Sequence, residues 1–212
     1  MTELLYLVCG VFLLTAVLVL WRRELPVLVR VLAVQGCALA GVAAVLAGSV
    51  EAALTAAGLL ILRAGVLPWL VRRMTARQGP DRRETRPVVN VTASLLSAAL
   101  LALVAYAVSR PLVELDPSPA SAAAPVGLTV VLIGFFVLVT RRRAVSQLVG
   151  FLVLDNGITA TGLLLGADPG LLVEIGVSLD VLLAVLVLQI LSGRMRQLFG
   201  GTDLGELREL RD

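Results

Sequence analysis

The chain has 212 residues, of which 58% are hydrophobic and 16% are charged, and its formal net charge is +3. This composition, with a mean hydropathy of +0.97, lies outside the soluble globular range and predicts a membrane protein. The sequence contains no histidine and no lysine, which excludes a histidine-ligated haem, a Schiff-base chromophore and a lysine-containing phosphate-binding loop. We therefore expect no cofactor, no bound metal and no catalysis by this chain alone. Cys9 and Cys37 lack CxxC spacing, and we expect them to be free, packed thiols.

Apolar runs bounded by charge or proline predict an all-α polytopic membrane protein with seven transmembrane helices. Helices are expected because lipid offers no partners for unpaired backbone groups. In chain order the predicted spans are 4–21, 26–49, 52–71, 87–109, 126–140, 144–166 and 170–192. The fifth is short for a span, and we expect the arginine run that follows it to mark its interfacial end.

The arginines are distributed unequally between the two sides of the predicted bundle. Fifteen of the 18 basic residues lie in alternate loops and the tail, which share one side, and Arg110 is the one loop arginine on the other side. Because cytoplasmic loops are enriched in basic residues, this asymmetry predicts an N-terminus outside and a C-terminus in the cytoplasm. Glu3 stands where a signal peptide has its basic region, and Arg22 and Arg23 follow the first apolar run. We therefore expect the first helix to be retained.

A weak internal repeat has an offset of 120 residues, at which the pair Arg22 and Arg23 matches Arg142 and Arg143. This pattern suggests two three-helix units in the same orientation, joined by the fourth span. The predicted organisation is a three-helix unit at 1–72, a linker with the fourth helix at 73–125, a second three-helix unit at 126–196 and a cytoplasmic amphipathic tail at 197–212.

Asp155 and Asp180 lie near the middle of the sixth and seventh predicted spans. A carboxylate at the bilayer midplane costs about 2.5–3.5 kcal/mol on insertion scales, so each must face protein or water. Two acids at matching depth on consecutive helices indicate a route for protons. The alternative for each is a structural acid that is hydrogen-bonded within the bundle. Glu174, nearer the outer surface, is either a second station on that route or an acid exposed to headgroups.

Arg63 lies in the middle of the third span, too far from either end to extend its charge easily to water. Pro68 follows it and loosens the helix backbone nearby. A cation at this depth needs a compensating acid, which Asp155, Asp180 or a neighbouring subunit could supply. We therefore predict a proton relay of Asp155, Asp180, Glu174 and Arg63, with purely structural pairing of Arg63 as the alternative.

The segment RRRAVSQLVGFLVLDNGI, followed by GLLVEIGVSLDVLLAVLVLQIL, resembles component E of the hydrogenase-4 and formate hydrogenlyase family. The resemblance extends to the seven-span layout and to ILRAGVLPWLVRR in the third span. Residues 126–196 are also similar to the three-span K subunit of respiratory complex I and to the C subunit of multisubunit cation/proton antiporters. In that pattern Asp180 matches the third-helix acid, whereas the second-helix glutamate would stand at Leu152. Component E proteins instead place their acid where Asp155 stands.

This resemblance implies a non-catalytic membrane subunit of a complex-I-like, nickel–iron hydrogenase or related oxidoreductase in a prokaryotic cell membrane. Its partners would be antiporter-like subunits, the subunit that anchors the quinone or hydrogenase module, and lipid, but no nucleic acid. Buried charged groups would contribute to proton translocation and link the redox arm to the antiporter-like subunits. Three alternatives stay open: a cation/proton antiporter subunit without a redox arm, a stand-alone seven-helix receptor, and a structural scaffold with its acids locked in ion pairs.

Overall fold

A computed structural model describes residues 1–76, 89–115, 117–141 and 143–166, and these residues form helices and short connections with no β-strand. The elements in chain order are α1 (Thr2–Trp21), α2 (Leu25–Leu46), α3 (Val50–Leu59), the π-helix η1 (Leu60–Val66), α4 (Leu67–Ala76), α5 (Val91–Leu115), the 3-10 turn η2 (Ser121–Ala123), α6 (Ala124–Thr140) and α7 (Ala144–Leu164).

Six stretches of these helices are long and apolar enough to cross a membrane. The third of them is continuous through α3, η1 and most of α4, from Val50 to Arg73. The all-helical membrane fold predicted from the sequence is therefore supported. The predicted seventh span (170–192), and with it the count of seven, lies outside the described residues, as does the predicted tail (197–212).

The predicted span boundaries differ from the structure by a few residues, and the two largest differences both lie at a proline. The fifth span is not short, because η2 and α6 run together from Ser121 to Thr140 and Pro125 lies in the first turn of α6. A proline there lacks only an N–H that has no intrahelical partner anyway. The fourth span was predicted to end at residue 109, but α5 continues to Leu115 with Pro111 inside the helix.

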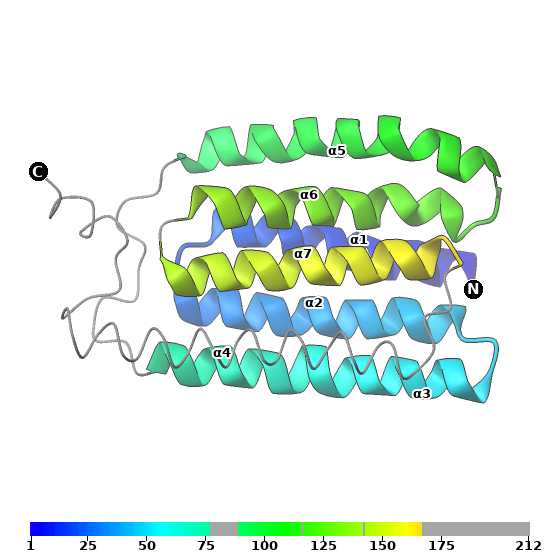
Figure 1. Ribbon diagram of the computed structural model, residues 1–212, viewed down its shortest axis with the longest axis horizontal. Helices are drawn as coiled ribbons and strands as arrows, with labels where there is room; N and C mark the ends of the chain where they lie inside the picture. Colours follow the sequence, from blue (N-terminus) through cyan, green and yellow to red (C-terminus); the bar gives the residue numbers. More distant parts are fainter. Residues whose placement is uncertain (77–88, 116, 142, 167–212) are drawn as a thin grey trace, which may run out of the picture.

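The helices form one bundle with their axes roughly along a common direction (Figure 1). Helix α5 lies at one edge, α6 lies next to it, and α1 and α7 follow towards α2. The continuous helix of α3, η1 and α4 lies at the opposite edge against α2. Buried apolar side chains such as Phe12, Leu32, Leu39 and Ile133 fill the space between these helices.

Glycines bring α6 and α7 into close antiparallel contact. A Cβ atom added at any of four positions would collide with the facing helix: Gly127 with Thr161, Gly134 with Leu154, Gly150 with Leu138 and Gly157 with Val131. Small residues at such seams let two transmembrane backbones approach closely. The resulting van der Waals packing holds the helices together in lipid, where there is no hydrophobic driving force between them. The seam therefore fixes where each α7 side chain points, including that of Asp155.

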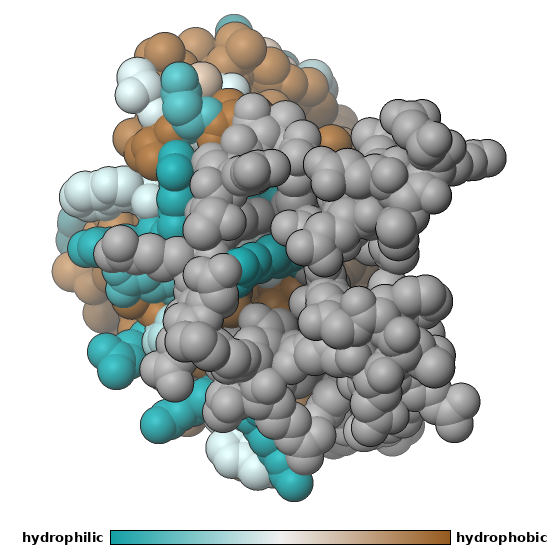
Figure 2. All heavy atoms as spheres, turned by 90° about the vertical axis from the view of Figure 1, so that its left-hand side faces the viewer, coloured by the Kyte–Doolittle hydropathy of each residue, from teal (hydrophilic) through white to brown (hydrophobic). Residues whose placement is uncertain are grey.

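The bundle surface is apolar along its sides and basic at one end. Large hydrophobic residues are exposed on α3 and α5, for example Leu54, Leu96, Leu100 and Leu103, as expected for surfaces that face lipid. The C-terminal ends of α1, α4 and α6 and the starts of α2 and α7 lie at the end of the bundle drawn at the left of Figure 1, and Figure 2 shows hydrophilic side chains at this end. The described arginines near these helix ends are Arg22, Arg23, Arg72, Arg73, Arg141 and Arg143.

The hairpins α1–α2 and α6–α7 both turn at this arginine end, and their turns have matching backbone conformations. The C-cap residues Arg22 (φ −85°, ψ 142°) and Arg141 (φ −86°, ψ 142°) are both extended. They are 119 residues apart, one fewer than the repeat offset predicted from the sequence. The N-cap residues Glu24 and Arg143 are extended as well. The two hairpins have the same orientation in the bundle, and the internal repeat itself stays a prediction.

Both cysteines are free. Cys9 is buried, as predicted, but Cys37 is exposed on α2, so the prediction that both thiols are packed was wrong for Cys37.

Candidate functional site: a buried ion pair across three helices

Arg63 is the largest fully buried side chain of the described residues, with 1% of its surface exposed. It lies in η1, where the backbone forms π-type hydrogen bonds, such as the one that the N–H of Leu67 donates to the carbonyl of Leu62. The π-helix ends just before Pro68, which has no N–H to donate and whose ring crowds the preceding turn. Single π-turns inside α-helices are frequent at functional sites.

Gly36 on α2 lets the backbone of η1 come close. A Cβ atom at this position would lie 2.5 Å from the carbonyl oxygen of Arg63, closer than real Cβ atoms approach. The absence of a side chain at Gly36 therefore allows α2 and η1 to touch at the level of Arg63. The guanidinium reaches across this contact towards α7.

Three polar side chains within one turn of α7 receive the Arg63 guanidinium. Its Nη1 donates to Oδ2 of Asp155 in an ion pair and to Oδ1 of Asn156 at 2.9 Å. Its Nη2 donates to Oγ1 of Thr159 at 3.0 Å. Asp155 is 9% exposed and Asn156 is 3% exposed, so these contacts are almost entirely removed from the surface of the bundle.

Gln35 of α2 extends this cluster to a third helix. Because Oδ1 of Asn156 accepts from Arg63, its Nδ2 is left to donate, and it donates to Oε1 of Gln35 at 3.2 Å. The orientation of both amides is thus set by the charge on Arg63. Gln35 is fully buried, and its Nε2 has no hydrogen-bond partner among the described residues. A buried donor without a partner costs about 1–3 kcal/mol, which marks this point as a site suited to a bound water.

The cluster lies at mid-depth of the apolar bundle. Gln35, Arg63 and Asp155 are each near the centre of a candidate span: Leu25–Leu46, Val50–Arg73 and Val145–Leu164. A charge at this depth is tolerated when it is paired and hydrogen-bonded. The arrangement therefore provides a titratable carboxylate beside a permanent cation, inside the membrane region and shielded from lipid. Within the residues that the structure describes, no three His, Cys, Asp or Glu side chains come together as a metal site would require.

Of the four residues predicted as a proton relay, the structure brings Arg63 and Asp155 into contact. Asp180 and Glu174 lie outside the described residues. No site role was predicted for Gln35 or Asn156 from the sequence. The available signal for Gln35 was that this amide interrupts the apolar and small residues of 31–46 on α2, because a polar side chain in a transmembrane helix usually bonds to a neighbouring helix.

Sequence comparison finds a relative with half of its residues identical. The chain is 50% identical over 207 residues to the uncharacterized protein Rv0085 of Mycobacterium tuberculosis (strain ATCC 25618 / H37Rv), and these cover 96% of this chain and 94% of that protein. The chain belongs to the family of Rv0085.

A more distant similarity links the chain to hydrogenase-4 component E. The protein of Escherichia coli (strain K12) is 27% identical over 142 residues, which cover 67% of this chain and 66% of that protein, and the Shigella flexneri protein gives the same values. No protein-family model and no solved structure matches the chain. The comparison supports a weak relation to component E, and this relation agrees with a subunit of a multisubunit membrane assembly.

Proposed function

We propose that this protein is a non-catalytic, multi-pass subunit of a complex-I-like oxidoreductase in the cell membrane, related to membrane-bound hydrogenases. In this role its buried charged residues contribute to proton translocation and connect the redox arm to antiporter-like subunits. The observation that carries the proposal is the Arg63–Asp155 ion pair at mid-depth of the bundle. The distant similarity to hydrogenase-4 component E supports the choice of assembly.

The physical reason for a relay is the position of the acid. A carboxylate in the hydrocarbon region is costly unless it is compensated, so such residues commonly mark ion or proton pathways. Asp155 can exist as a charged or a neutral group, whereas Arg63 stays charged. Protonation of Asp155 would therefore change the net charge of the cluster and weaken the electrostatic attraction between Asp155 and Arg63. Asp180 and Glu174 are the further stations that we propose on the last predicted span.

One observation favours a second candidate function, a structural scaffold. The two Nη atoms of Arg63 are held by Asp155, Asn156 and Thr159 together, and a cation with these three partners can simply lock α7 to η1. If the protein is a structural scaffold, Asp155 keeps one protonation state throughout. The two candidates therefore differ in what happens when the carboxylate is replaced by an amide that still accepts a hydrogen bond.

Purification of the tagged chain from its native membranes in mild detergent tests the assembly. We expect other membrane subunits and a metal-binding oxidoreductase module to co-purify and to be identified by mass spectrometry. Co-purification with antiporter subunits in the absence of any redox subunit would favour the antiporter alternative. Recovery of the chain alone would contradict membership of a complex.

Proton translocation by the whole complex in vesicles tests the relay. Asp155→Asn keeps the size and the hydrogen-bond acceptor but removes the titrating proton, so we expect a normal amount of assembled complex with impaired coupling between redox turnover and proton movement. Glu114→Gln is the matched control, because Glu114 also pairs with an arginine, Arg110, at 3.8 Å, but both side chains are about two-thirds exposed. Equal proton translocation by the two variants and the wild type would leave the scaffold function.

A further inference from the structure

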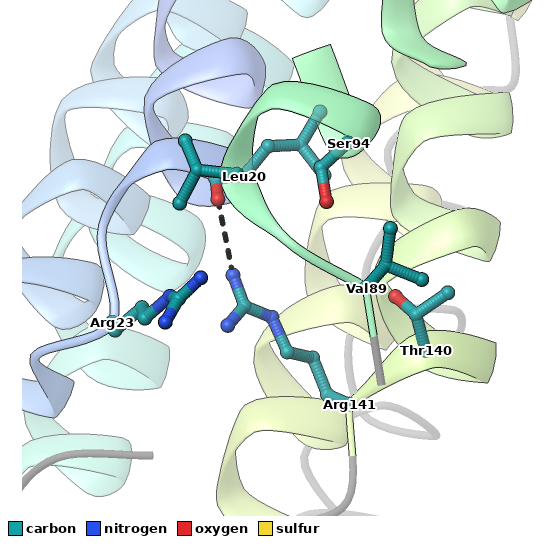
Figure 3. Close-up of a pocket in the computed structure, with 7 residues that line it drawn as sticks. Leu20, Arg23, Val89, Ser94, Thr140 and Arg141 are labelled. Carbon is teal, nitrogen blue, oxygen red and sulfur yellow. Dashed lines mark hydrogen bonds between the residues drawn. The ribbon is translucent and has the colours of Figure 1, made fainter. Parts of the chain in front are cut away.

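A second polar site lies at the arginine end of the bundle, well separated along the helices from the Arg63–Asp155 pair. A small pocket opens there between the C-terminal ends of α1 and α6 and the segment that leads into α5 (Figure 3). Two guanidinium groups line it, from Arg23 and Arg141, together with the hydroxyl groups of Ser94 and Thr140. The rest of its wall is apolar.

Arg141 is fixed in this pocket by the end of α1. Its side chain is 7% exposed, and its Nη2 donates to the carbonyl oxygens of Val19 at 3.1 Å, Leu20 at 3.3 Å and Arg22 at 3.4 Å. The last carbonyls of a helix have no intrahelical donors and carry partial negative charge, so a cation is favoured there. This explains why an arginine is buried at a point where the sequence analysis expected an interfacial charge.

Arg23 contributes a second positive charge to the same pocket. It is half-buried in the α1–α2 turn, and Figure 3 shows its guanidinium directed towards that of Arg141. Within residues 1–76, 89–115, 117–141 and 143–166, the structure gives Arg23 no hydrogen-bond or ion-pair partner. Two facing cations repel each other unless an anion lies between them.

The hydroxyl groups of the pocket do not balance the charge of Arg23. The Ser94 hydroxyl donates to the carbonyl of Asn90 at 3.0 Å, and the Thr140 hydroxyl donates to the carbonyl of Phe136 at 2.7 Å. Neither is ionisable, and no carboxylate is present among the described residues that line the pocket. The local chemistry is therefore that of a site for one oxyanion, with guanidinium N–H groups as its donors.

The level of the pocket in the membrane indicates where the anion comes from. Trp21 and Trp69 are exposed at this end, and the guanidiniums of Arg22 and Arg73 lie 5.1 Å and 5.5 Å from the centres of their rings. Exposed tryptophan with adjacent arginine is typical of the lipid headgroup level. The hollow itself is about the size of one water molecule, so it would admit one phosphate oxygen while the rest of a headgroup stays at the mouth.

We propose that Arg23 and Arg141 bind a phosphate oxygen of an anionic phospholipid at this end of the bundle. Basic pockets between transmembrane helices are suited to such headgroups because the helices fix the cations and the membrane supplies the ligand at high local concentration. The site does not depend on the proposed role in proton translocation, since none of its residues belongs to the Arg63 cluster.

Lipid binding by the purified full chain tests the proposal. Phosphatidylglycerol is titrated into the detergent-solubilised protein, and the bound lipid is measured by native mass spectrometry, with phosphatidylcholine and inorganic phosphate as parallel arms. Arg23→Gln removes the charge of a residue that makes no hydrogen bond or ion pair with the part of the chain that the structure describes. Arg22→Gln is the matched control, because it removes one charge from the adjacent, exposed residue at the same level.

We expect Arg23→Gln to weaken phosphatidylglycerol binding by about 10–100-fold, as for loss of hydrogen bonds from a charged donor. Arg22→Gln should weaken it by no more than about fivefold, the effect of one basic residue near an anionic surface. Equal weakening by the two variants would show only a diffuse surface charge and would overturn the site. Competition by millimolar inorganic phosphate, or equal binding of phosphatidylcholine, would overturn the assignment to an anionic lipid.

Discussion

Removal of the Arg63 guanidinium should destabilise the bundle far more than removal of both members of the ion pair. In Arg63→Met the Asp155 carboxylate loses its cation while it remains 9% exposed. Breaking a buried ion pair from one side costs about 3–5 kcal/mol, because one charge stays buried without compensation. Asn156 and Thr159 lose a donor at the same time, so the upper part of this range is expected.

The double variant, with Arg63→Met and Asp155→Leu, removes both charges and fills the space with apolar groups. Such replacements are often neutral or stabilising, so the double variant should recover most of the loss. Asp155→Asn leaves the Arg63 guanidinium without its counter-ion, but the amide oxygen still accepts from Arg63, so its cost should lie at the lower end of the same range, about 3 kcal/mol. The measurement is equilibrium unfolding of the full chain in mixed detergent micelles, followed by helical ellipticity.

The exposed pair Arg110–Glu114 provides the control for this cycle. Its side chains are 67% and 71% exposed, and removal of Arg110 should cost no more than about 1 kcal/mol. A loss for Arg63→Met as small as that for Arg110→Met would contradict this expectation. So would losses from Arg63→Met alone and Asp155→Leu alone that simply add in the double variant, since the two members of a coupled pair are not additive.

Three further results are expected from the packing. Gly134→Ala should destabilise the bundle by at least about 1–3 kcal/mol in the same unfolding assay, because its Cβ would overlap the backbone of the facing helix. Gly10→Ala is the control: a Cβ at this position meets open space, so the substitution should be neutral or slightly stabilising. Cys37 should react with a maleimide in detergent while Cys9 stays unmodified until the protein is unfolded, which peptide mass spectrometry can resolve. Gln35→Leu should change stability by less than about 1 kcal/mol, because removal of its unpaired Nε2 offsets the lost amide bond; a loss as large as that of Arg63→Met would contradict this account.

The helical fold could be predicted from the sequence because bilayer length and the need to pair every backbone group leave few options for long apolar runs. The predicted starts and ends were less accurate where proline was taken as a boundary. Pro125 and Pro111 both lie within helical segments, the first where its missing N–H has no consequence and the second in an exposed part of α5. The sequence pattern alone cannot tell a proline that stops a helix from one that a helix accommodates.

The sequence allowed individual residues of the candidate site to be predicted, but not which of them are in contact. Arg63 and Asp155 each stood out because a charge in an apolar run is costly, and that cost does not depend on knowing the fold. Their pairing depends on the position of η1 against α7, which follows from Gly36 and from the glycine seam between α6 and α7. Gln35 and Arg141 carried no comparable signal. One is an uncharged amide, and the other belongs to an arginine run whose members looked equivalent.

The π-helical turn gives α3 and α4 a mechanical connection to the charge at the centre of the bundle. Arg63 lies on the same continuous helix that ends near Arg72 and Arg73, so any sliding or rotation of that helix moves the guanidinium relative to α7. Increasing the separation of the two charges from about 4 Å to about 8 Å costs about 2 kcal/mol at an effective dielectric constant of about 20. A neighbouring subunit that displaced the exposed end of this helix would therefore change the electrostatic energy of the ion pair at the middle of the helix. Conversely, a change of charge at Asp155 would favour a displacement of the helix.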